Sequence, residues 1–196
     1  MKTIKFIGAL ILAFTSVLAM AQNADVNIND SKIKWEGKKI GGAHDGYIKL
    51  KSGNIEMNNG DIVSGNFVVD MNSITNTDLE DPTYNQKLVG HLKSDDFFGV
   101  ATYPEAKFVI ASTDIKNGKG MVTGNITIKG KTESITFPVE RTGKDYTAKI
   151  EIDRSKFDVR YGSSSFFSGL GDKAIDDIFT LKVLLVLDMN TTTTMK

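Results

Sequence analysis

The two histidines of the chain, His44 and His91, are the side chains whose type most directly suggests chemistry. A histidine pair can act as general acid and base, or it can ligate a metal ion. A catalytic zinc site needs a third protein ligand, and no His-x-x-x-His or Glu-x-x-His spacing is present. Three roles therefore stay open for each histidine: a structural hydrogen bond near a turn or helix end, contact with a ligand head group, or metal-dependent catalysis.

Two arginines and a phenylalanine pair extend this set of candidates. Arg154 and Arg160 could pair with a diphosphate, because guanidinium forks match phosphate oxygens, or with loop carboxylates nearby. Phe97 and Phe98 follow His91 and could act as a lid over a cavity or as the anchor of a long loop. The chain contains no cysteine, which excludes a thiolate nucleophile, a thiolate metal site and disulfides.

The N-terminus has the pattern of a secretory signal peptide. Lys2 and Lys5 precede an apolar run from Phe6 to Phe14, and Ala19-Met20-Ala21 matches the A-x-A cleavage pattern. The alternative is an uncleaved membrane anchor, but the apolar run is short for a spanning helix. We therefore expect residues 1–21 to be removed after Ala21 and residues 22–196 to form an exported, periplasmic domain.

The charge balance argues against two classes of partner. The chain has 24 basic and 24 acidic residues, and removing the two leader lysines leaves 22 basic against 24 acidic. A near-neutral protein without basic clusters lacks the electrostatic footprint of nucleic-acid binding. No polybasic or amphipathic segment suits a lipid surface, so we expect no stable membrane anchor.

Apolar and polar residues alternate from Val26 onward, with Gly- and Asn-rich turns between the runs, which is typical of antiparallel strands. Two longer segments interrupt this pattern. In residues 72–104, Asp81-Pro82 predicts the start of a helix that ends near Leu92, and residues 154–174 are polar and irregular. Roughly eight or nine strands without helical crossovers favour an all-β barrel or sandwich over an α/β fold.

The strand parity predicts which large apolar residues share the inner face. An eight-stranded barrel can enclose one small ligand, but periodicity alone does not separate such a pocket from a solid core. The candidates for an apolar lining are Trp35, Ile48, Phe67, Val69, Phe108, Phe137, Leu181, Val183 and Leu185.

Several motifs, in order along the chain, resemble those of the YceI family of exported bacterial proteins. The resemblance covers nearly all of residues 22–196. It implies an eight-stranded antiparallel lipocalin-like barrel with a short helical insert and a second irregular loop. The motifs are Gly42–Gly46, Gly65–Met71, Leu88–Phe98, Tyr103–Phe108, Gly124–Gly130 and Asp153–Val159.

The family resemblance also implies a function, namely binding of a long isoprenoid inside the barrel, such as a polyprenyl phosphate or diphosphate or a quinone-like lipid. It implies neither catalysis nor a cofactor. Besides the nine lining residues, we expect His44, His91, Phe97, Phe98 and Arg154 to contact this ligand. Two other functions stay open, a histidine-dependent and metal-using enzyme or a solid-cored stress or interaction protein, and so does a homodimer.

Overall fold

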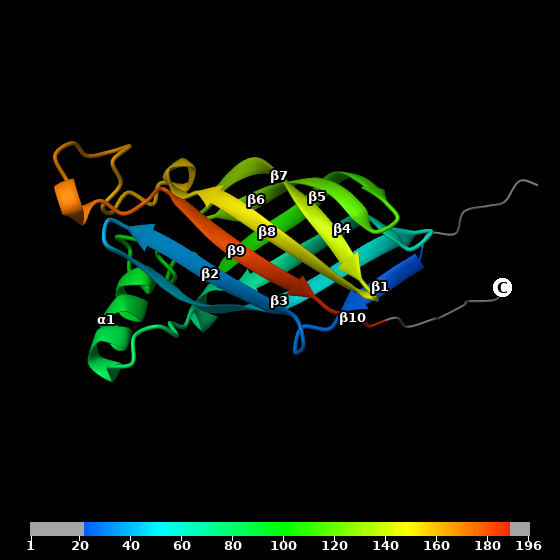
Figure 1. Cartoon of the computed structure of the whole chain (residues 1–196), viewed down its shortest axis with the longest axis horizontal. Helices are drawn as coiled ribbons and strands as arrows, with labels where there is room; N and C mark the ends of the chain where they lie inside the picture. The colour runs from blue at the N-terminus through cyan, green and yellow to red at the C-terminus, as the bar shows by residue number, and fades with distance from the viewer. Residues whose placement is uncertain (1–21, 189–196) are drawn as a thin grey trace, which may run out of the picture.

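The computed structural model describes residues 22–188, which form an all-β protein (Figure 1). The expected signal peptide and the last eight residues lie outside this range. Eight antiparallel strands close into a barrel, which confirms the predicted fold class. They are β2 (Lys32–Lys39), β3 (Gly42–Asn58), β4 (Asp61–Asp70), β5 (Glu105–Lys116), β6 (Lys119–Ile128), β7 (Lys131–Thr142), β8 (Asp145–Asp153) and β9 (Ile178–Leu185).

The barrel closes through β3, which is the longest strand. One edge of β3 pairs with β4, and the first part of its other edge pairs with β2. Beyond β2, the same edge pairs with β1 (Gln22–Val26), which in turn pairs with β10 (Leu187–Asp188). β1 and β10 therefore continue β2 and β9 along the length of the barrel and do not add strands to its circumference.

Three irregularities of register change which residues face the interior. They lie between Leu50 and Ser52 in β3, between Glu56 and Met57 where β3 pairs with β4, and between Ile110 and Ser112 in β5. An extra residue reverses the alternation, because side chains point to opposite faces with a period of two. As a result, Leu50 and Ile55 both reach the core although their numbers differ in parity.

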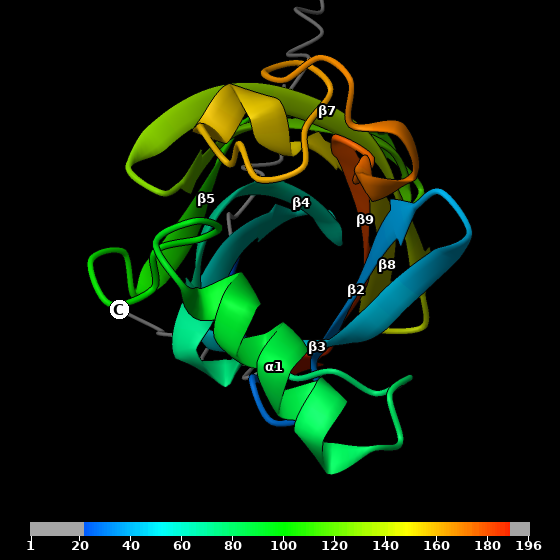
Figure 2. The same ribbon diagram turned by 90° about the vertical axis from the view of Figure 1, so that its left-hand side faces the viewer.

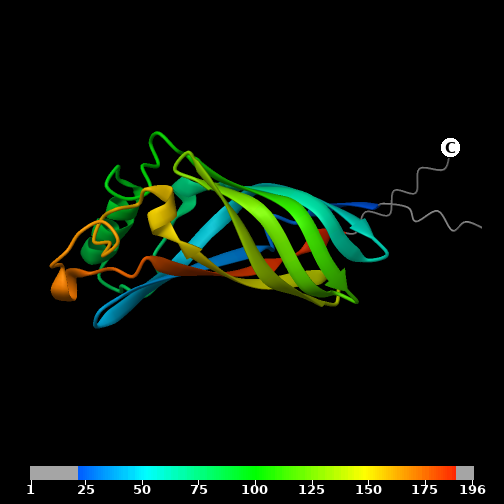
Figure 3. The ribbon, with the colours of Figure 1, turned by 90° about the horizontal axis from the view of Figure 1, so that it is seen from above.

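The two ends of the barrel are built differently (Figures 1 and 3). Tight hairpin turns close one end, and Asn59-Gly60 and Asn117-Gly118 adopt the positive φ angles that such turns require. The other end carries α1 (Pro82–Lys93) and the long β8–β9 connection, which contains short 3-10 turns at Arg154–Phe157 and Gly171–Lys173. Figure 2 looks onto this end, with α1 crossing beside the opening.

Helix α1 begins where the sequence predicts. The Asp81 carboxylate accepts hydrogen bonds from the Thr83 and Tyr84 amides, and Pro82 occupies the first turn. The apolar side chains of Tyr84, Leu88 and Leu92 are spaced four residues apart and share one face of α1. This face packs only in part, since Leu92 is buried and Tyr84 is 62% exposed. The N-terminal half of α1 therefore extends beyond the barrel wall.

The connection from β4 to α1, residues 71–81, is called the strap below. It continues alongside β3 where β4 has ended, and its backbone satisfies the free edge of that strand. The Thr75 amide donates to the Tyr47 carbonyl and the Thr77 amide to the Asp45 carbonyl, both at 2.9 Å. This close approach requires glycine at position 46, because a Cβ there would lie 1.9 Å from the Thr75 carbonyl oxygen.

We predict that Gly46→Ala lowers the free energy of unfolding by about 1–3 kcal/mol, since the strap must shift away from β3. Gly37→Ala is the matched control, because Gly37 lies in β2 opposite His44 and a Cβ there meets no atom within 4 Å. Urea denaturation of both variants measures the effect. Equal stability of the two variants would contradict the close packing of the strap.

Candidate functional site

The interior of the barrel contains two adjoining apolar chambers. The mouth chamber lies at the α1 end, and the inner chamber lies toward the hairpin turns. Each chamber has a cavity volume of ≈ 130 Å³, well above the ~10–15 Å³ that a single water molecule needs. Four residues that line both chambers form what we call the waist: Ile33, Val69, Ile126 and Leu181.

The middle of the barrel is not close-packed. Six inward-facing side chains contact the apolar clusters on both sides of them and yet stay only partly buried. In an ordinary core, side chains of this size are fully enclosed and interdigitate at crystal-like density. The accessible surface of these residues therefore faces the chambers. They are Ile48, Val69, Phe108, Ile135, Ile150 and Leu181.

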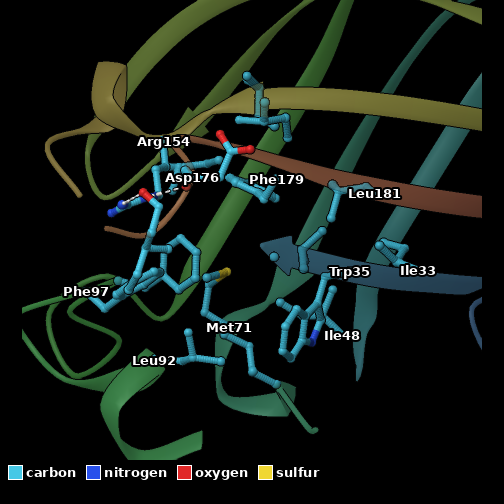
Figure 4. A pocket seen from close by; sticks show the side chains of 18 residues that line it. Ile33, Trp35, Ile48, Met71, Leu92, Phe97, Arg154, Asp176, Phe179 and Leu181 are labelled. Carbon is cyan, nitrogen blue, oxygen red and sulfur yellow. Dashed lines mark hydrogen bonds between the residues drawn. The ribbon is translucent and has the colours of Figure 1, made fainter. Parts of the chain in front are cut away.

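The mouth chamber is apolar except at its rim (Figure 4). Trp35 from β2 and Phe179 and Leu181 from β9 form part of its wall, while Met71 and Leu92 approach from the strap and α1. The polar side chains that contribute to the lining are Arg154 and Asp176. The lining of the inner chamber contains three aromatic rings in contact, and the ring centroids of Phe108 and Phe137 lie 5.4 Å apart.

The structure places twelve of the expected ligand contacts in the chamber walls. In the mouth chamber these are Trp35, Ile48, Val69, Phe97, Phe98, Arg154 and Leu181. In the inner chamber they are Phe67, Val69, Phe108, Phe137, Leu181, Val183 and Leu185. Their contact with a ligand stays a prediction. Neither His44 nor His91 lines a chamber.

Other lining residues were not singled out from the sequence. Ile126, Ile128 and Ile152 lie on predicted strands, and the alternation of those strands could have identified them. Met71 continues the alternation of Phe67 and Val69 just beyond the end of β4, so periodicity marks it. Ile74 and Ile175 belong to irregular segments that bring them to the mouth only through tertiary contacts, and no periodic signal marks these two.

Arg154 is almost wholly buried, with 2% of its surface exposed. Its guanidinium donates to the backbone carbonyls of Val159, Tyr161, Ile175 and Asp176 at 2.9–3.0 Å. It also lies 3.3 Å from the carboxylate of Asp177. Burial lowers the pKa of the guanidinium, and the nearby carboxylates oppose this shift. Four of its five N–H groups thus donate to backbone carbonyls, and the nitrogen that carries the fifth lies beside the Asp177 carboxylate, so Arg154 is held by acceptors of the protein itself.

Phe97 and Phe98 join the mouth to α1. Phe97 is buried beneath the Arg154 guanidinium, which lies 5.5 Å from the ring centroid. Phe98 packs edge-on against Phe97 at 4.9 Å and faces Phe179 at 6.3 Å. Both rings anchor the loop that follows α1, and both also line the mouth chamber.

His44 fastens the strap to the start of β3. Its Nδ1 atom lies 2.7 Å from the Asp78 carboxylate, which also accepts from the Asp45 amide at 2.8 Å. Burial alone would raise the pKa of Asp78, but hydrogen bonds from Asp45, His44 and Asn76 outweigh it and lower that pKa. These contacts match the structural alternative for His44.

His91 occupies a different place, in the last turn of α1. Its ring packs edge-to-face on Tyr161, with ring centroids 4.3 Å apart, and on Phe97 at 5.7 Å. Its Nε2 atom is buried without a hydrogen-bond partner. His91 therefore joins α1 to the β8–β9 connection by ring packing.

Within residues 22–188, no group of three or more His, Asp or Glu side chains is arranged to hold a metal ion. No helix there combines the length and apolar character needed to span a bilayer.

A closed barrel with an unfilled apolar interior and a covered mouth is the architecture of lipocalin-like barrel proteins. More specifically, the model of the YceI-like domain matches residues 25–187, and the chain belongs to this family.

Individual relatives are less similar. A UPF0312 protein of Shewanella denitrificans is 40% identical over 55 residues, which is 28% of this chain and 29% of that protein. The chain thus matches less than half the length of its curated relatives. The crystal structure of BcnA from Burkholderia cenocepacia has a TM-score of 0.65 and 28% identity, covering 84% of this chain and 99% of that one. A polyisoprenoid-binding domain from Saccharophagus degradans, implicated in plant cell wall breakdown, shares the fold with a TM-score of 0.57 and 14% identity over 84% of this chain and 97% of that one.

We predict that Arg154→Met destabilises the protein by about 3–5 kcal/mol, because four carbonyls and the Asp177 carboxylate lose their buried partner. Arg154→Lys retains the charge but not the forked arrangement of N–H donors, so its stability should lie between those of Arg154→Met and wild type. Arg160→Met is the control, since Arg160 is exposed and pairs with Asp158. Denaturation midpoints compare the variants, and a neutral Arg154→Met would refute the assignment of Arg154 as a structural residue.

The lowered pKa of Asp78 predicts a stability contribution that depends on pH. The folded-state pKa lies below the ordinary 3.8, so this contribution is complete above that value and disappears as pH falls through the folded-state pKa. The stability difference between wild type and Asp78→Asn should therefore be constant near neutral pH and shrink under acid conditions.

Urea denaturation of both proteins between pH 7 and pH 3 tests this, with Asp30→Asn in the β1–β2 turn as the control. A difference that grows on acidification would have the wrong sign for this mechanism.

Proposed function

We propose that this protein is an exported, periplasmic binding or carrier protein that holds a long isoprenoid-type lipid inside the barrel. The observation that carries the proposal is the pair of unfilled apolar chambers that meet at the waist. The polyisoprenoid-binding domain from Saccharophagus degradans, which shares the fold, supports the same class of ligand. The proposed export depends on the N-terminal sequence pattern.

The chambers suit a chain better than a compact molecule. Together they extend from the mouth at α1 into the inner half of the barrel, and the four waist residues line both of them. At roughly 25 cal/mol per Å² of apolar surface removed from water, a chain of tens of carbons could reach micromolar affinity after the cost of ordering it.

The polar residues in the lining of the mouth chamber favour an uncharged head group over a diphosphate. A diphosphate needs cationic partners, but the Arg154 guanidinium is held by acceptors of the protein itself and the neighbouring Asp176 side chain has the wrong charge. A neutral, quinone-like head group meets neither obstacle. Within the proposed class we therefore favour an uncharged isoprenoid over a polyprenyl diphosphate.

The other candidate functions gain less support. His44 contacts Asp78 at the strap, whereas His91 packs against Tyr161 at the β8–β9 connection, so the two histidines share no contact that would suggest a catalytic pair. A solid-cored protein would bury the mid-barrel side chains that here face open space.

Organic extraction of the purified protein, followed by mass spectrometry, tests the proposal. An isoprenoid lipid should be recovered, or an empty preparation should take up ubiquinone or menaquinone dispersed in detergent micelles. A preparation that is empty and also takes up neither these quinones nor polyprenyl phosphate would refute the proposed function.

The waist provides a sharper test. Leu181→Trp adds bulk between the two chambers and should weaken uptake of a long-chain quinone by about tenfold or more, or ~1.4 kcal/mol. Lys182→Trp is the matched control, since Lys182 is the next residue of β9 and points to solvent. Titration by intrinsic tryptophan fluorescence is unsuitable with added tryptophans, so binding is measured with a radiolabelled quinone. Equal losses in both variants, or none, would argue against a ligand that passes the waist.

A further inference from the structure

The β8–β9 connection exposes aromatic side chains at the mouth of the barrel. Tyr161, Phe166 and Phe167 are 49%, 39% and 50% exposed, in a segment otherwise rich in serine and glycine. Ile40, at the tip of the β2–β3 hairpin, is 61% exposed. The hairpin and the connection are joined by a bridge between Lys39 and Ile175 and lie side by side at this end (Figures 1 and 3). We call these four residues the apolar rim.

The exposure of the two phenylalanines is built into the fold. The Phe166 and Phe167 amides both donate to the carbonyl of Ser163, which is itself fully buried. At the base of the loop, the Ile175 amide donates to the Gly162 carbonyl at 2.8 Å. Arg154 then binds carbonyls on both sides of this base. The turn that presents the phenylalanines is therefore anchored to the most buried charge of the protein.

The rim is also continuous with the mouth chamber. Ile175 and Asp176, which end the loop, belong to the chamber lining. A long isoprenoid is insoluble in water and resides in lipid, so it must reach the mouth from a lipid phase. Aromatic side chains beside the opening could enter the head-group region of a bilayer and bring the mouth into contact with that phase.

The charges around the rim fit a phospholipid surface. Between residues 160 and 174 the loop contains Arg160, Asp172 and Lys173, but Arg160 is paired with Asp158. Lys39 adjoins Ile40, and neither Lys39 nor Lys173 is among the ion pairs of residues 22–188, so both can face lipid phosphates. The groove beside Phe167 also contains Asp95 and Asp96, which limits the electrostatic part of the attraction.

We propose that the apolar rim docks the protein reversibly on a phospholipid bilayer, with Phe166 and Phe167 inserted and the mouth of the barrel facing the lipid. This inference rests on the proposed function, because the need for docking follows from an insoluble ligand. The contact is transient, since four half-exposed side chains bury far less apolar surface than an anchor does.

The experiment uses the full-length mature protein and vesicles of phosphatidylethanolamine and phosphatidylglycerol that contain no isoprenoid lipid. Wild type should co-sediment with these vesicles. The partition coefficient of Phe166→Ser/Phe167→Ser should be lower by about tenfold or more, because two inserted rings are lost. The control is Val109→Ser/Met121→Ser, which removes two exposed apolar side chains from the barrel wall. It should bind vesicles as wild type does.

Charge is tested separately. Lys39→Gln/Lys173→Gln should reduce binding to phosphatidylglycerol vesicles by roughly thirtyfold, because two cations that face the anionic surface are lost. Binding to phosphatidylcholine vesicles should change little. Lys144→Gln, in the β7–β8 turn at the opposite end, is the control.

The outcomes separate this inference from the proposed function. If wild type does not bind vesicles but takes up quinone from micelles, the docking proposal is overturned and the proposed function stands. If vesicle binding depends on Phe166 and Phe167 while no source of quinone is taken up, docking stands and the proposed function fails. If wild type is a dimer that does not bind vesicles and Phe166→Ser/Phe167→Ser is a monomer, the apolar rim is an interface between two copies, and the docking proposal is overturned.

Discussion

The structure depends on closing one sheet without leaving a hydrogen-bonding edge around its interior. β3 achieves this because its seventeen residues are long enough to pair with β4 along one edge and with β2 and β1 in turn along the other. Where β4 ends, the strap supplies the missing partners, and Gly46 permits the contact. An unpaired backbone edge at this point would be a template for pairing with another strand.

Arg154 performs the corresponding task at the mouth. It draws together chain segments on both sides of the β8–β9 connection and covers the ring of Phe97, so the rim, the loop after α1 and the wall of the mouth chamber share one support. A buried guanidinium that donates to four carbonyls and lies beside a carboxylate is a structural element. Within residues 22–188, Arg154 is the basic residue in the lining of the mouth chamber.

The sequence predicts the inward-facing residues where the strands alternate regularly, and it does not predict them where the alternation is interrupted. Strand alternation placed Phe67, Leu181 and Val183 correctly on the inner face, since a residue on a strand has only two faces to choose from. The bulge after Leu50 was invisible to this reasoning, because a single extra residue reverses the parity without any distinctive composition.

The roles of irregular segments were harder to predict. The chemistry of Arg154 and the histidines favours ligand contacts. Arg154 and His44 instead contact backbone carbonyls and carboxylates up to 34 residues away in sequence, whereas His91 packs on the ring of Tyr161. The unfilled interior was equally undetermined, because inward-facing apolar residues read the same whether or not their side chains meet at the centre.

That unfilled interior has a mechanical consequence. Unfolding under hydrostatic pressure is favoured by the internal void volume that it eliminates, and the two chambers, at ≈ 130 Å³ each, contribute to that volume. The empty protein is therefore expected to be unusually compressible and sensitive to pressure, whereas a chain lying through the waist would fill the void and remove that sensitivity. The response to compression thus reports whether the barrel is occupied, without requiring that its occupant be identified.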